Sequence, residues 1–193
     1  GGKYIKSFAL GDYQIQIGQG LNMWSSYAFG KSADISTMKR TAMPIRPYTS
    51  VDENRYMRGA AIDFGFGNFS LLTFASVKNV DAVTIADSSI EDLEFVSTIN
   101  LSGMHRTNSE IEKQNGLQEY IGGLNLRYQN NGLKLGLAAV YQGYDKEFNK
   151  EIRPCNQYDF RGKENFSFSG DYNYIYKNVN LFGEISKNRY NQN

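Results

Sequence analysis

The sequence contains long stretches in which apolar and polar residues alternate. Residues 13–24, YQIQIGQGLNMW, place Tyr13, Ile15, Ile17 and Leu21 in one phase and mostly glutamine, glycine and asparagine in the other. Successive side chains of a β-strand point to opposite faces, so this period of two predicts a strand with one apolar and one polar face.

The same pattern recurs in the second half of the chain, at 120–128, 133–142 and 166–176. Strands with the same alternation are expected at 55–65 and 179–186, and weaker or less regular strands at 3–11 and 69–78. The apolar phase of the three clearest stretches contains Leu124, Leu126, Leu133, Leu135, Leu137, Phe168, Tyr172 and Tyr174. The chain is therefore expected to form about eight strands in a single β-domain, residues 1–193.

Short and long connections separate these strands. Short turns rich in glycine and asparagine, which tolerate positive φ, are predicted at 11–12, 65–68, 129–132 and 177–178. Long polar segments are expected at about 25–54, 79–119 and 143–164. Short turns at one end and long loops at the other are typical of outer-membrane barrels, where the turns are periplasmic and the loops extracellular. Within the middle loop, 95–104 is strand-like and is expected in an extracellular hairpin or an inward-folded segment.

Strand length and composition favour the same fold class. The predicted strands reach 10–12 residues, against about 5–6 in typical soluble sheets. Aromatic residues make up 14% of the chain, which suits sheets and the aromatic girdles of barrels. The mean hydropathy of −0.52 excludes a helical membrane protein but not a barrel, in which only alternate residues face lipid. We therefore expect an all-β, antiparallel transmembrane β-barrel or part of one, with the apolar phases above facing lipid.

A soluble β-sandwich or a lipocalin-like barrel would show the same alternation, with the apolar phase in its core. Under that alternative the protein is a secreted β-protein that binds a glycan or lipid ligand through its tyrosines.

Residues 31–58 form the densest polar region. The candidate polar network there consists of Lys39, Arg40, Arg46, Asp52, Glu53, Arg55 and Arg58. If this loop folds into a barrel, its arginines could bind passing anions, since guanidinium groups bind carboxylate and phosphate with two hydrogen bonds. The alternative is an internal network of salt bridges that fixes the loop to the wall. Gly18 and Gly20 lie in the polar phase of 13–24, where missing side chains would let this loop approach closely.

Signals for catalysis or metal binding are weak. Ser36 to Lys39 matches the S-x-x-K motif of serine acyl enzymes, but no K-T-G follows. His105 is the single histidine and Cys155 the single cysteine, and the acidic run at 87–94 lacks EF-hand spacing. We predict no enzymatic activity, no metal and no cofactor. The net charge of +1 gives no basic excess for nucleic acid, which is not expected as a partner.

Several motifs resemble a family of Bacteroidota outer-membrane β-barrel proteins that contain a helix-hairpin-helix region and whose role is poorly defined. The motifs are GQGL-x-x-W at 18–24, IRPY-x-S-x-DEN at 45–54, RGAA at 58–61, SGMHRT-x-SEIE at 102–112 and YDFRGK at 158–163. The resemblance implies an outer-membrane location, contact with outer-membrane lipid and with other outer-membrane proteins, and a fragment of a longer chain. The family supplies no defined activity. From the barrel architecture we expect a structural or transport role, or that of a subunit in a larger secretion or uptake complex. No helical hairpin is visible in these residues, so the resemblance implies no nucleic-acid binding.

Overall fold

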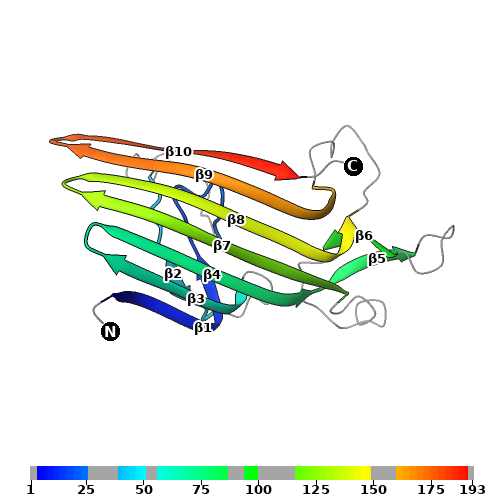
Figure 1. The fold of residues 1–193 in the computed structure, drawn as a ribbon. Coiled ribbons are helices and arrows are strands. Elements are labelled where there is room, and N and C mark those ends of the chain that lie inside the picture. Colours follow the sequence, from blue (N-terminus) through cyan, green and yellow to red (C-terminus); the bar gives the residue numbers. More distant parts are fainter. Residues whose placement is uncertain are drawn as a thin grey trace.

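The computed structural model describes residues 4–25, 39–50, 56–86, 94–99, 116–148 and 160–190, and these form an all-β fold (Figure 1). No helix occurs among them, and so none that is long and apolar enough to cross a membrane. The strands are β1 (Ile5–Ile15), β2 (Ile45–Pro47), β3 (Met57–Phe66), β4 (Phe69–Val80), β5 (Ala82–Ala86), β6 (Glu94–Ile99), β7 (Leu117–Asn130), β8 (Leu133–Phe148), β9 (Gly162–Tyr176) and β10 (Val179–Tyr190).

The strands belong to one sheet, whose main path runs β10-β9-β8-β7-β4-β3-β1-β2. Every neighbouring pair on this path is antiparallel, which confirms the predicted all-β, antiparallel fold. The sheet is open, with β10 and β2 at the two ends of the path. β5 and β6 form a hairpin beside this path, and β6 pairs with β8 in parallel over Phe95 and Val96.

Three of the four predicted short turns are confirmed. β3 turns into β4 at Gly67, β7 into β8 at Asn131 and Gly132, and β9 into β10 at Lys177. The residues named here all have positive φ, between 39° and 84°, which glycine and asparagine adopt at low cost. The three turns lie together at one end of the sheet (Figure 1).

The strand-like segment 95–104 was expected in an extracellular hairpin or an inward-folded loop. In the structure Glu94–Ile99 form β6, which pairs with β5 as a hairpin. Residues 100–104 lie outside the described part of the chain.

The predictions for the first strands were wrong. No turn occurs at Gly11 and Asp12: β1 continues through them, and Gly11 pairs with Gly59. The strand predicted at 13–24 ends at Ile15. The following residues fold back as the inner loop, defined here as residues 16–24, whose ends meet in a bridge between Gln16 and Trp24. Gly18 (φ 56°) and Gly20 (φ 87°) take left-handed conformations that turn the chain out of the sheet.

The sheet has two distinct faces. The inner face, which the inner loop covers, carries an apolar cluster together with polar residues. The cluster contains Tyr13, Ile15, Ile17, Met57, Ala61, Leu72, Phe74, Ala138 and Val140. The opposite, outer face carries large apolar side chains that remain exposed on every long strand, among them Phe8, Leu10, Phe69, Leu124, Leu126, Leu135, Leu137, Phe168, Tyr172, Tyr174, Leu181 and Ile185.

Three residues predicted to face lipid are buried on the inner side of the sheet instead. Tyr13 and Ile15 of β1 and Ile17 of the inner loop are at most 1% exposed, because they belong to one apolar cluster with side chains of β3, β4 and β8. The Tyr13 hydroxyl donates to the carbonyl oxygens of Ala60 and Ala75, at 3.2 and 2.7 Å. Leu21, also predicted to face lipid, is exposed but belongs to the inner loop rather than to a strand.

The predicted apolar phase of the later strands does form one exposed surface. Leu124, Leu126, Leu135, Leu137, Phe168, Tyr172 and Tyr174 are all exposed on the outer face. Leu133 shares their phase and is half-buried at the turn end of β8.

Candidate functional site

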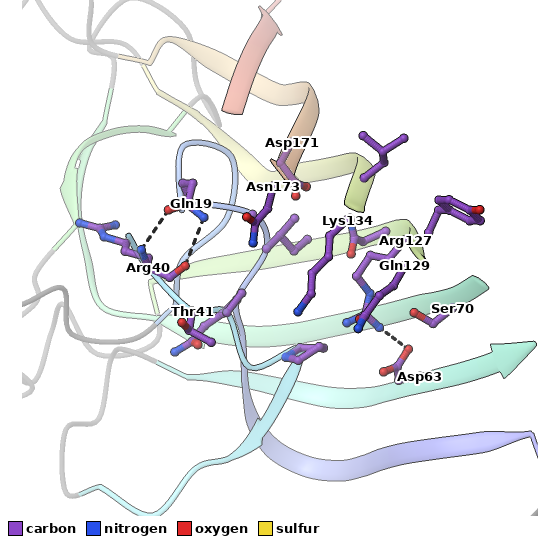
Figure 2. Close-up of a pocket in the computed structure, with 18 of the residues that line it drawn as sticks. Gln19, Arg40, Thr41, Asp63, Ser70, Arg127, Gln129, Lys134, Asp171 and Asn173 are labelled. Carbon is purple, nitrogen blue, oxygen red and sulfur yellow. Dashed lines mark hydrogen bonds and ion pairs between the residues drawn. The ribbon is translucent and has the colours of Figure 1, made fainter. Parts of the chain in front are cut away.

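A pocket of about 520 Å³ lies between the inner face of the sheet, the inner loop and residues 39–44 (Figure 2). Its size suits a small organic molecule. Its charged lining residues are Lys6, Lys39, Arg40, Arg127 and Lys134, with Asp63 and Asp171. Neutral polar groups come from Gln19, Ser70, Asn125, Gln129 and Asn173. The pocket is therefore polar and carries more positive than negative charge.

One ion pair orders the floor of the pocket. The Arg127 guanidinium on β7 donates through Nη2 to Oδ1 of Asp63 on β3, across the intervening strand β4 (Figure 2). Asp63 is buried, and Arg127 remains partly accessible from the pocket. A buried carboxylate is stable only when it is paired, so Asp63 fixes the position of the Arg127 side chain.

Arg127 is not fully satisfied by this pair. Its Nε is buried and has no hydrogen-bond partner among the described residues, and the same holds for Oδ1 of Asn173, which also lines the pocket. Buried polar atoms in folded proteins are nearly always hydrogen-bonded, so two unsatisfied atoms beside one pocket indicate room for a polar ligand or for water.

The inner loop forms the wall of the pocket opposite the sheet. A residue of β10, at one end of the sheet's main path, holds this loop in place. Oε2 of Glu184 on β10 accepts hydrogen bonds from the backbone amides of Gln19 (2.8 Å) and Leu21 (3.0 Å). A Cβ atom at Gly18 would lie 2.8 Å from Cδ of Glu184, so the carboxylate fits only because Gly18 has no side chain. Asn22 adds contacts to β9, where its amide donates to Ser169 (3.1 Å) and its carbonyl oxygen accepts from Ser167.

Gln19 links the inner loop to residues 39–44. Its side-chain amide donates to the Arg40 carbonyl oxygen (3.1 Å) and accepts from the Arg40 amide (2.9 Å), as a neighbouring strand would. The Arg40 guanidinium lies 5.2 Å from the centre of the Trp24 ring, a favourable cation–π distance. This wall of the pocket is thus built from side chain to backbone contacts rather than from ion pairs.

The predicted polar network of residues 31–58 is only partly assembled. Lys39 and Arg40 line the pocket, and Arg40 lies against Gly20, as the sequence predicted for this loop. Arg46 is exposed on β2 and does not line the pocket.

Arg58 was predicted wrongly as part of this network. It lies on the outer face, where its Nε is 2.8 Å from Oδ1 of Asp12. Its phase on β3 explains this, because Met57 and Gly59 take the inner positions.

The remaining candidates lie outside the described residues. These are Asp52, Glu53, Arg55, Ser36, His105, Cys155 and the acidic residues 87–92.

Most of the charge in the pocket comes from strands rather than from the loop. Lys6, Asp63, Arg127, Lys134 and Asp171 lie on β1, β3, β7, β8 and β9 respectively. The signal for four of them was present in the sequence, because Asp63, Arg127, Lys134 and Asp171 occupy the polar phase of alternating strands. The alternation does not predict that Lys6 lines the pocket. Lys6 lies at a register shift between Ile5 and Ser7, and its side chain packs beside Gly65.

The polar groups of the pocket are suited to binding an anion. Among the described residues, no three histidine, cysteine or acidic side chains lie together as a metal site would require. Guanidinium, ammonium and amide groups converge on the pocket, and these groups recognise oxyanions.

Comparison with protein-family models, with curated proteins and with solved structures found no match for this chain.

Proposed function

We propose that the chain is an outer-membrane β-barrel protein or a segment of one, with a structural or transport role or as a subunit of a larger outer-membrane secretion or uptake complex. In this proposal the outer face of the sheet contacts lipid and the inner face, with its loop and pocket, forms the lumen.

The observation that carries the proposal is the chemistry of the outer face. Leu124, Leu126, Leu135 and Leu137 form a continuous exposed surface on two neighbouring strands, and similar side chains extend it to β1 and β10. Soluble monomers rarely expose apolar patches larger than a few hundred Å². Lipid would remove this surface from water without any second protein layer.

Aromatic side chains mark both ends of the outer face. Near the tight turns, the ring centres of Phe69 and Tyr128 lie 4.9 Å apart, and those of Tyr174 and Tyr176 lie 6.4 Å apart. Towards the other end, Tyr141 contacts Phe166 at 4.8 Å. Aromatic girdles at the two lipid–water boundaries have this arrangement.

The distance between the two aromatic rows fits a bilayer. Tyr120 and Tyr128 are eight residues apart on β7. At ~3.4 Å per residue this is ~27 Å along the strand, and ~21 Å along the axis of a barrel whose strands tilt by ~40°. The apolar band of outer-membrane barrels is ~25 Å tall.

A secreted β-protein that binds a glycan or lipid is the competing proposal. It requires another layer to cover the outer face, because the described strands form a single sheet. The resemblance to the Bacteroidota outer-membrane family supports the barrel instead.

Two arginine substitutions on the outer face test the proposal. Leu124 is 48% exposed midway between Tyr120 and Tyr128 on β7, and Val179 is 55% exposed at the turn end of β10. In a bilayer, Leu124→Arg should lower the free energy of unfolding by about 2–4 kcal/mol, and Val179→Arg, near the interface, by about 0–1 kcal/mol. Unfolding in urea of the chain refolded into liposomes measures both.

A soluble protein would respond differently. Both positions are exposed to a similar degree, so both substitutions would then be nearly neutral. Equal effects of the two variants, together with a wild-type chain that stays in solution without detergent, would exclude the barrel proposal.

A further inference from the structure

We propose that the pocket is a binding site for a small oxyanion, a phosphate or carboxylate group, held by Arg127, Lys134 and Lys6. This names the class of solute for the lumen of the proposed barrel. The pocket lies on the inner face, however, so binding can be measured without any assumption about what covers the outer face.

The charge of the pocket supports an anion. Five cationic side chains line it, against two carboxylates. Asp63 is already paired with Arg127. Asp171 folds back over Gly136, where a Cβ atom would lie 2.0 Å from its Oδ1. A cleft lined by an excess of one charge concentrates ions of the opposite sign.

The three proposed cationic ligands of the anion differ in whether an ion pair fixes their side chains, and we infer a different role for Arg127 than for the two lysines. Arg127 is fixed by Asp63 and keeps a buried Nε without a partner among the described residues. Lys134 and Lys6 form no ion pair with any described residue and reach the pocket from β8 and β1. In Figure 2 the Lys134 side chain extends towards Arg127 and Asp63. A fixed guanidinium would orient the oxyanion, and the two lysines would close around it.

Asn173 restricts the ligand further. Its side chain is buried, and its Oδ1 has no hydrogen-bond partner among the described residues. A carbonyl oxygen accepts hydrogen bonds, so it favours an anion that also carries a hydroxyl group. Monohydrogen phosphate and hydroxy acids meet both requirements.

Calorimetric titration of the full chain with inorganic phosphate and with malate tests the site and separates the two sources of oxyanion. Glycerol serves as the neutral control ligand. We expect one or both anions to bind, and glycerol not to bind. Replacing both lysines, Lys6→Gln with Lys134→Gln, should weaken anion binding at least about tenfold, because two charged contacts are lost.

The control variant is Lys163→Gln, which removes an exposed lysine of β9 outside the pocket. It should bind the anions as the wild type does. The inference would be overturned if neither anion binds more tightly than glycerol, or if the double variant and the control variant bind equally well. These outcomes are independent of the liposome experiment, so failure of the anion site and failure of the barrel proposal can be told apart.

Discussion

The carboxylate of Glu184 binds the backbone amide of Gln19 at 2.8 Å and so joins β10, at one end of the sheet, to the loop that follows β1, near the other end. The same oxygen accepts from the Leu21 amide, and the other oxygen, Oε1, is buried without a hydrogen-bond partner among the described residues. Glu184 is therefore the charged acceptor that holds the inner loop, in addition to the contacts of Asn22 with β9.

Glu184→Gln should loosen the inner loop without unfolding the sheet. The amide side chain keeps one acceptor oxygen but loses the charge that strengthens both hydrogen bonds, at a cost of about 1–2 kcal/mol. Hydrogen exchange of the Gln19 and Leu21 amides should become about 5–30 times faster. Glu147→Gln, which changes an exposed carboxylate at the end of β8, is the control and should leave these amides unchanged. Equal exchange in the two variants would contradict the role given to Glu184.

Gly18→Ala and Gly67→Ala separate backbone strain from crowding. The two glycines have nearly the same φ, 56° and 57°, but a Cβ atom at Gly67 meets nothing within 4 Å, whereas one at Gly18 meets Glu184. In both variants the left-handed backbone strains the new alanine and should lower the free energy of unfolding by about 1–2 kcal/mol. Gly18→Ala should lower it further, because Glu184 must move. Chemical denaturation measures the difference. If the two variants are equally stable, Glu184 does not occupy the space beside Gly18.

The pair of Asp63 and Arg127 should show strong coupling in a double-mutant cycle. Arg127→Gln leaves a buried carboxylate without its partner, and should cost about 3 kcal/mol, the lower end of the range for a broken buried pair, because Arg127 is partly accessible. Asp63→Asn combined with Arg127→Gln should be less destabilising than the sum of the single variants. Additive free energies of unfolding would show that the pair contributes little.

Truncation of one buried and one exposed side chain of β1 tests the assignment of the two faces. Ile15 is 0% exposed and Leu10 is 84% exposed. Ile15→Ala should cost about 2–5 kcal/mol, since it removes apolar contacts and leaves a cavity. Leu10→Ala creates no cavity in the protein and should cost at most about 1 kcal/mol in detergent micelles. If Leu10→Ala were more destabilising than Ile15→Ala, Ile15 would lie on the lipid side, as the alternation alone predicted.

The strand pairs β3–β4, β7–β8 and β9–β10 could be predicted because each combines two independent signals. Alternation gives the strands, and residues that tolerate positive φ, such as Gly67 and Gly132, give the turns between them. Lys177 also takes a positive φ, of 50°, which a lysine does not predict. The alternating stretches on either side predicted this turn instead.

The face of β1 could not be predicted for a physical reason. A period of two identifies which residues share a face, but it does not say whether lipid or protein covers that face. Ile15 and Leu137 look alike in their local patterns. They differ because the inner loop, turned by Gly18 and Gly20, adds an apolar cover over one end of the inner face. The ion pair in the pocket could not be predicted from local patterns either. Asp63 and Arg127 are 64 residues apart in the sequence, and the pairing of β3, β4 and β7 brings them together.

The long sequence separation between the inner loop and its anchor also sets an order of events during folding. The contact between Gln19 and Glu184 spans 165 residues. Contacts of such range close slowly, because the intervening chain must first give up its conformational freedom. Residues 16–24 leave the ribosome before β10, yet they can reach their final position only after β10 has been added to the sheet. Docking of this loop is therefore a late step, and until then the pocket lacks one of its walls.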